Sequence, residues 1–165
     1  MAGTKKGGVM RIRCLSLRQP WATLMSISAK KIETRSWQTS YRGLIAIHAA
    51  KGFSREARDL CWQQPFYDAL KAVGLDERHL PLGRIVGIGR LLNVAPTHKI
   101  REIHWLLSAE ELAFGDYHDG RFAWHFGATV KQLPEPVTAP GKLGLWWWEV
   151  PEQLEPLCET ASGAQ

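Results

Sequence analysis

Three runs of sequence decide the fold: LSLRQPWATLM at 15–25, AKKIETRSW at 29–37 and YRGLIAIHAAK at 41–51. Residues 11–17, which overlap the start of the first run, are expected to form a strand. Pro20 then takes the first position of a helix, where proline is favoured. Residues 32–37 alternate in the manner of a strand. The apolar stretch 44–49, which carries His48 near its end, is also typical of a strand.

Short helices and further strands are expected after these runs. Ser54 should cap a helix, Gly74 should end the next one, and Ser108 with Glu111 has the pattern of a capping box. More strands are expected at 84–94, 122–127 and 143–150.

Several curved strands with few helices predict an α+β fold, a small β-barrel with peripheral short helices. In the strand at 84–94, Gly87 and Gly89 favour a bend. In the strand at 143–150, Trp147 should face the opposite side from Trp146 and Trp148.

A length of 165 residues predicts one domain. The expected boundaries are a disordered basic tail at 1–9, the domain at 10–151 and a C-terminal tail at 152–165.

The composition is that of an ordinary globular protein, with 45% hydrophobic and 22% charged residues. A net charge of +5 favours polyanionic partners. The three cysteines contain no CxxC pair, which argues against a zinc ribbon, and unpaired thiols suit a reducing cytoplasm. Because no long apolar run or signal peptide stands out, we expect a cytoplasmic protein with no membrane partner.

Cations and aromatic rings alternate through the three runs. Arg18, Lys30, Arg35 and Arg42 are interleaved with Trp21 and Trp37, and a phosphate–base ligand requires both a cation and a ring. The alternation places Glu33, Arg35 and Trp37 on one side of a strand, where an ordinary half-buried strand would carry apolar residues. The alternatives are a solvated basic face over core aromatics and a structural salt bridge.

Other candidate residues lie outside these runs. Arg121 and Trp124 follow a loop at the start of a strand, a place where barrels bind ligands. His48 fits either a structural histidine or an acid–base group. The spacing of His118, Asp119 and His125 matches no standard metal site, and no GxGxxG loop is present, so neither metal nor cofactor is expected.

A set of motifs in this order resembles the ASCH family, the activating signal cointegrator homology domain. The motifs are SLRQPWATL at 16–24, Lys30-x-x-Glu33-x-Arg35-Ser36-Trp37, Tyr41-Arg42-Gly43 with Ile47-His48-Ala49, Leu80-Pro81-x-Gly83, Gly115-x-Tyr117-x-x-Gly120-Arg121-x-Ala123-Trp124 and Gly141-Lys142-x-Gly144-Leu145-Trp146. They cover roughly residues 12–150.

The resemblance implies a PUA-like β-barrel and a role in nucleic-acid recognition. Family members are reported as RNA- or DNA-binding modules, a few as ribonucleases, and one branch as an amidohydrolase acting on acetylated cytidine. By this resemblance, Lys30, Glu33 and Arg35 line a cleft, with Tyr117, Arg121 and Trp124 opposite.

Two departures qualify that transfer. Ser28 stands where the family commonly has Gly, so the turn before Lys30 is expected to differ in shape. Glu33 stands where the amidohydrolase branch carries its Thr nucleophile, with Thr34 and Ser36 nearby.

Two functional hypotheses follow. The first is a binding module for RNA, single-stranded nucleic acid or a nucleobase-containing small molecule. The second is a small hydrolase, a ribonuclease or nucleoside amidohydrolase, in which Glu33 accepts a proton and Lys30 stabilises an oxyanion. A protein-interaction module is a third interpretation, favoured by the eight tryptophans.

Overall fold

The computed structural model describes residues 3–102 and 107–163 of the chain. Within them the strands are β1 (Thr4–Lys6), β2 (Val9–Leu17), β3 (Ile32–Arg35), β4 (Gly43–Ala49), β5 (Arg84–Leu91), β6 (Asn93–Pro96), β7 (Phe122–His125), β8 (Lys131–Thr138) and β9 (Leu145–Glu149). The helices are α1 (Trp21–Ser26), α2 (Arg55–Leu60), α3 (Phe66–Lys71), α4 (Thr97–Glu102), α5 (Ala109–Phe114), the 3-10 turn η2 (Glu152–Leu154) and α6 (Glu155–Gly163).

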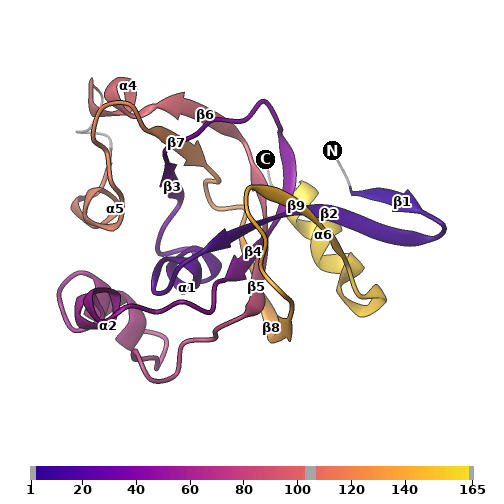
Figure 1. Cartoon of the computed structure of the whole chain (residues 1–165), viewed down its shortest axis with the longest axis horizontal. Helices are drawn as coiled ribbons and strands as arrows, with labels where there is room; N and C mark the ends of the chain where they lie inside the picture. The colour runs from indigo at the N-terminus through magenta and orange to yellow at the C-terminus, as the bar shows by residue number, and fades with distance from the viewer. Residues whose placement is uncertain (1–2, 103–106, 164–165) are drawn as a thin grey trace.

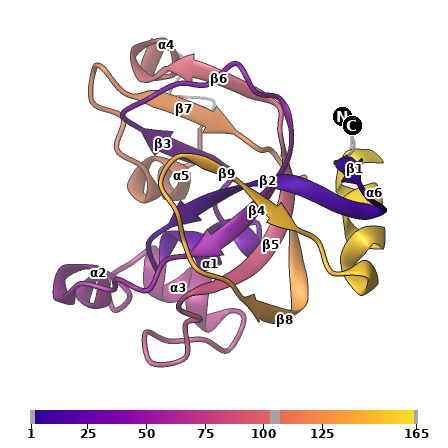
Figure 2. The same cartoon turned by 45° about the vertical axis from the view of Figure 1, so that its right-hand side comes forward.

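The larger sheet has the strand order β1-β2-β4-β5-β8, with β9 also paired to β2. It curls into part of a barrel (Figures 1 and 2). β2 and β4 run parallel, with Ser16 opposite His48, whereas β4–β5 and β5–β8 are antiparallel. Because β2 and β4 are parallel, their carboxyl ends lie at the same edge of the sheet.

A second, three-stranded sheet has the order β3-β7-β6. Antiparallel pairing sets Glu33 opposite Trp124 and Thr34 opposite Ala123. The chain passes from the larger to the smaller sheet at Leu92, between β5 and β6. The single strand expected at 84–94 is therefore two strands that belong to different sheets.

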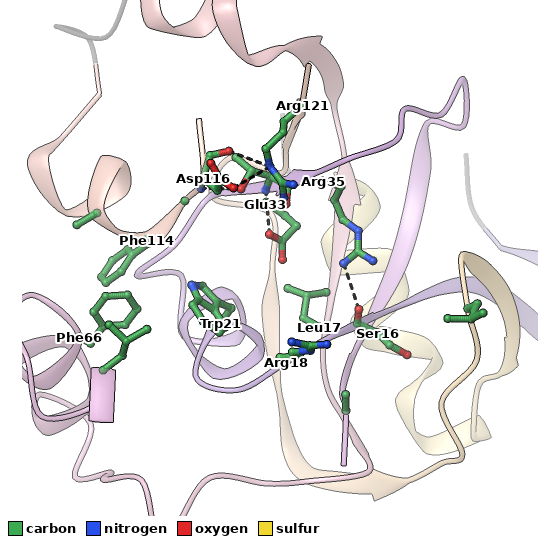
Figure 3. Close-up of a pocket in the computed structure, with 16 residues that line it drawn as sticks. Ser16, Leu17, Arg18, Trp21, Glu33, Arg35, Phe66, Phe114, Asp116 and Arg121 are labelled. Atoms are coloured by element: carbon green, nitrogen blue, oxygen red, sulfur yellow. Dashed lines mark hydrogen bonds and ion pairs between the residues drawn. The ribbon is translucent and has the colours of Figure 1, made fainter. Parts of the chain in front are cut away.

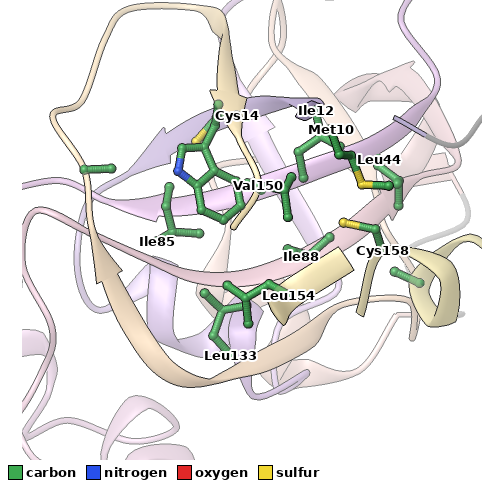
Figure 4. Packing of buried hydrophobic residues seen from close by; sticks show 14 of the residues in the cluster. Met10, Ile12, Cys14, Leu44, Ile85, Ile88, Leu133, Val150, Leu154 and Cys158 are labelled. Carbon is green, nitrogen blue, oxygen red and sulfur yellow. The ribbon is translucent and has the colours of Figure 1, made fainter. Parts of the chain in front are cut away.

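Both faces of the larger sheet are buried, so alternate residues of β4 enter different cores. Leu44 and Ala46 pack toward α6, in a core with Ile12, Cys14 and Cys158 (Figure 4). The other face of β4 packs beneath α1 and the smaller sheet, in a core that contains Ile45, Ile47, Met25, Trp124 and Phe126.

The expected fold class is confirmed, since the chain is a small α+β barrel with short helices at its periphery. Ser54 caps α2 by accepting from Ala57 N at 3.2 Å, and Ser108 caps α5 by accepting from Glu111 N at 3.0 Å. The expected facing of the tryptophans is also confirmed, because Trp147 is 37% exposed while its neighbours are 8% exposed.

The structure corrects the expected ends of the domain. Residues 4–6 form β1 and pair with residues 9–11 of β2, so this part of the basic tail is not disordered. The C-terminal tail contains α6, which buries Cys158 and Ala161 in the core. Residues 1–2 and 164–165 of the expected tails lie outside the described residues. Strand β8 was not expected, because its Pro134 and Pro136 argue against a strand, but prolines are tolerated in a strand at the edge of a sheet.

Across the described ranges 3–102 and 107–163, no helix has the length and apolar character needed to cross a membrane.

Candidate functional site

A cavity of about 570 Å³ opens between the carboxyl end of β2, the start of α1, β3 and the loop that follows α5. This volume falls in the range of small-ligand pockets. Its lining consists of aromatic, cationic and carboxylate groups together with backbone: Ser16, Leu17, Arg18, Trp21, Glu33, Thr34, Arg35, Ala50, Leu60, Phe66, Ala113, Phe114, Gly115, Asp116, Arg121 and Leu143. We call this cavity the cleft.

One wall of the cleft is aromatic (Figure 3). Trp21 meets the edge of Phe66 with ring centroids 6.2 Å apart, and Phe66 meets Phe114 at 5.0 Å. The three rings come from α1, α3 and α5. The buried side chain of Gln19 fixes the start of α1, since its Oε1 accepts from Thr23 N at 3.0 Å and its Nε2 donates to Pro81 O at 2.8 Å.

The opposite wall is polar, and the Glu33 carboxylate points from it into the cleft (Figure 3). Glu33 is only 8% exposed, and its Oε1 accepts from Thr34 N at 2.8 Å. Arg35 is half-buried beside it and donates from Nη1 to Ser16 O at 3.3 Å. Burial lowers the pKa of Arg35, an effect that the nearby Glu33 carboxylate opposes.

Arg121 is fixed above Glu33 by the backbone of β3 and by Asp116. Its Nη2 donates to Thr34 O at 3.0 Å, and its Nε lies 3.3 Å from Asp116 Oδ2. Asp116 is held in turn by Thr34 Oγ1, which accepts from Asp116 N at 2.9 Å. A hydrogen bond from His118 keeps the pKa of Asp116 below its usual value, so the carboxylate stays ionised.

The charge of the cleft is biased toward cations. Asp116 is paired with Arg121, which leaves the cations of Arg18 and Arg35 facing the single carboxylate of Glu33. Arg18 is exposed at the rim. The cleft therefore presents rings, one hydrogen-bond-accepting carboxylate and an excess of guanidinium groups, which together suit an anionic aromatic ligand.

Lys30 is placed differently from the expectation. It is fully buried, does not line the cleft, and donates from Nζ to Ile32 O at 2.5 Å and to Phe114 O at 3.3 Å. Burial lowers the pKa of Lys30, although Glu33 and Glu111 oppose that effect. Lys30 therefore joins β3 to the end of α5 and links the two walls of the cleft.

Glu111 completes this support. Its carboxylate accepts from Lys31 N at 3.0 Å and from Ile32 N at 2.9 Å. The expected capping box is thus only half present, because Ser108 caps the helix but Glu111 binds the backbone of β3. Ser28, in the turn before Lys30, adopts φ 61°, in the left-handed region that favours glycine, and donates from Oγ to Val130 O at 3.2 Å.

Four other expected site residues do not line the cleft. Trp124 is completely buried and donates from Nε1 to Trp37 O at 3.1 Å, so it cannot stack on a base without leaving the core. Trp37 is half-buried, with its ring edge-on to Trp124 at 4.7 Å and beneath the Arg35 guanidinium. Tyr117 is 8% exposed. Arg42 is exposed and bonds to the backbone oxygens of Thr39 and Tyr41.

Of the expected residues, the structure brings Arg18, Trp21, Glu33, Arg35 and Arg121 together at the cleft. Phe66, Phe114 and Asp116 also line the cleft, although they are not among the expected site residues. Phe66 and Phe114 had only the local signal of a helical position, and their meeting depends on how α3 and α5 pack.

Cys61 and Cys158 are buried side chains. Burial raises the pKa of the Cys61 and Cys158 thiols to about 11, which keeps both protonated near neutral pH. Among residues 3–102 and 107–163, no three His, Cys, Asp or Glu side chains are grouped so that they could hold a metal ion.

Comparison with known proteins shows similarity to Activating signal cointegrator 1. The chain is 31% identical over 90 residues to the protein of Mus musculus and 33% identical over 92 residues to that of Homo sapiens. This similarity supports an ASCH-like domain in the chain. No family model matches the chain. Each match covers 54% of this chain but only 15% of the relative, so the ASCH-like domain corresponds to a small part of those proteins.

Proposed function

We propose that the ASCH-like domain binds RNA or another single-stranded nucleic acid and takes one base into the cleft. The observation that carries this proposal is the pairing of an aromatic wall with a wall of arginines around Glu33. Bases stack on aromatic side chains, and guanidinium groups bind phosphate oxygens. A duplex would hide the base, so a single strand is the better ligand.

Each group of the cleft has a role in this proposal. Trp21 is half-buried, which leaves part of its indole open to a base. Glu33 accepts a hydrogen bond from a ring N–H or exocyclic amine of that base. Arg18 and Arg35 bind the phosphate, while Arg121 is held by Asp116 and Thr34 and orients the polar wall.

The test is fluorescence anisotropy with labelled single-stranded RNA. Trp21→Ala should weaken binding by roughly 1–3 kcal/mol, the usual contribution of one stacked base. The matched control is Trp62→Ala, since Trp62 is 54% exposed on the loop after α2 and does not line the cleft. Equal RNA affinities of the two variants would contradict the proposal that a base binds in the cleft.

Glu33→Gln tests the polar wall separately. The carboxylate only accepts hydrogen bonds, whereas an amide also donates. The substitution should therefore change the order of affinities among poly(A), poly(C), poly(G) and poly(U). If Glu33→Gln lowered the overall affinity but left the order of affinities among the four polymers unchanged, Glu33 would not take part in base recognition.

The hydrolase hypothesis receives less support. It needs Lys30 Nζ at the reacting atom, but this group is buried and donates to two backbone carbonyls. The three cysteines are free and buried, which suits a reducing compartment, and we include the cytoplasm in the proposal on that ground.

A further inference from the structure

A second cavity of about 360 Å³ adjoins the cleft and shares Ser16, Ala50 and Leu143 with it. It lies where the parallel strands β2 and β4 end, beneath the loop that joins β8 to β9. Its remaining lining residues are His48, Lys51, Gly141 and Lys142. We call it the lysine cavity.

The lysine cavity is cationic. Lys51 follows the end of β4, and its aliphatic stem lies against Gly83, where an added Cβ would be 3.0 Å from Lys51 Cγ. Lys142 comes from the β8–β9 loop, with its ammonium 5.8 Å from the ring of Trp146. No carboxylate lines the cavity, and within residues 3–102 and 107–163 neither lysine forms an ion pair.

The loop that carries Lys142 is held in place by a close contact. A Cβ added at Gly141 would lie 2.8 Å from His48 Cε1 and 3.3 Å from Ser16 Oγ. Only glycine allows this approach without a shift of the loop. The position of Lys142 over the cavity is therefore set by the packing of Gly141 on β2 and β4.

Ser16 presents a hydrogen-bond acceptor to the junction of the two cavities. His48 Nε2 lies 2.8 Å from Ala139 O, and because a carbonyl can only accept, Nε2 carries the proton. In the neutral ring Nδ1 is then an acceptor, so the Ser16 hydroxyl donates to it at 3.0 Å. The hydroxyl proton of Ser16 is thus used in the bond to His48, and the lone pairs of Ser16 Oγ can accept a hydrogen bond from a ligand. Burial lowers the pKa of His48, which keeps the ring neutral.

Together these groups match a ribose joined to a phosphate. The two ammonium groups can bind phosphate oxygens, which Ser16 cannot do because it has no free proton. Ser16 can accept from a ribose 2′-hydroxyl, the group that distinguishes RNA from DNA. We propose that the lysine cavity is a ribose–phosphate subsite for the nucleotide next to the base in the cleft, and that it selects RNA over DNA.

This inference rests on the proposed function, since it places the strand relative to the cleft. The strand runs from the cleft past Ser16 and Leu143 and reaches the lysines. Two lysines on one phosphate predict one counterion-releasing contact in addition to those made by the arginines of the cleft.

Salt-dependent anisotropy with single-stranded RNA tests the phosphate part. In the double variant K51Q/K142Q, the slope of log affinity against log salt should fall by about 0.7, the value for one phosphate on a single strand. The control K6Q/K99Q removes the same charge from two exposed lysines on β1 and α4 that line neither cavity, and should keep the wild-type slope. Equal slopes for the two double variants would overturn the phosphate contact.

Ser16→Ala tests the ribose part. RNA affinity should fall by roughly 2- to 10-fold, the value of one lost hydrogen bond, while DNA of the same sequence should bind as before. An equal change for RNA and DNA would overturn the assignment.

The failure of this inference differs from the failure of the proposed function. Wild-type binding that depends on Trp21 but is insensitive to Lys51, Lys142 and Ser16 would reject the subsite alone. An absence of wild-type binding to either polymer would reject both.

Discussion

The buried Lys30 offers a sharp test of whether this residue supports the fold or contacts the ligand. Its Nζ donates to Ile32 O and Phe114 O, and its stem fills space in the interior. A hydrogen bond from a charged donor contributes roughly 1.5–3 kcal/mol, and the second bond is long at 3.3 Å. Against this gain stands the cost of burying an ammonium group, which its substitution removes. Lys30→Ala should therefore lower the free energy of unfolding by about 2–4 kcal/mol, with the cavity it leaves included.

For a chain of 165 residues this corresponds to a fall in Tm of about 4–16 °C. The assay is urea denaturation followed by tryptophan fluorescence, with Tm measured in parallel. The control is Lys31→Ala, which removes the same charge from the adjacent exposed side chain and should stay within about 0.5 kcal/mol of wild type. Equal stability of the two variants, with RNA binding or turnover lost only in Lys30→Ala, would refute the supporting role.

Three further predictions concern the interior. Trp124→Ala should destabilise by about 3–5 kcal/mol in urea denaturation, because the ring is fully buried; a loss below 1 kcal/mol would contradict its place in the core. Burial lowers the pKa of His48, so the unfolded chain binds more protons. The contribution of His48 to stability should thus be complete above the unfolded pKa of about 6.5 and should decline as the pH falls below it. In His48→Asn, the urea midpoint should therefore change less between about pH 7.5 and 5.5 than in wild type. Gly141→Ala should lower Tm through the contact of its Cβ with His48, whereas Gly52→Ala, which meets no atom within 4 Å, should leave Tm unchanged.

The sequence predicted local features well. The caps at Ser54 and Ser108 follow from side chains that accept from a backbone N–H three residues away. The alternation over β3 correctly placed Glu33 and Arg35 on one side, and both line the cleft. Trp37 left that pattern because β3 ends at Arg35 and the chain bends.

The pairing between segments that are distant in the chain could not be predicted from the sequence. Arg121 reaches the cleft because β7 pairs with β3, and the same pairing sets the fully buried Trp124 opposite Glu33. Nothing local distinguishes an indole that lines a cleft from one that fills the core beneath it.

The lysine cavity has the same origin. Ser16 and His48 are 32 residues apart and meet only because β2 and β4 are parallel neighbours. The motifs that carry the ASCH resemblance contain most of these residues, but the contacts among them come from the sheet.

We propose that the cleft binds single-stranded nucleic acid through phosphates and one stacked base. Its most direct test is a titration of labelled single-stranded RNA with wild type and Trp21→Ala at several salt concentrations. We expect saturable binding whose log affinity falls linearly with log salt by about 0.7 per phosphate contact, and a Trp21→Ala line that is parallel and lower. An absence of wild-type binding even at low salt, or a Trp21→Ala line superimposed on that of wild type, would contradict it.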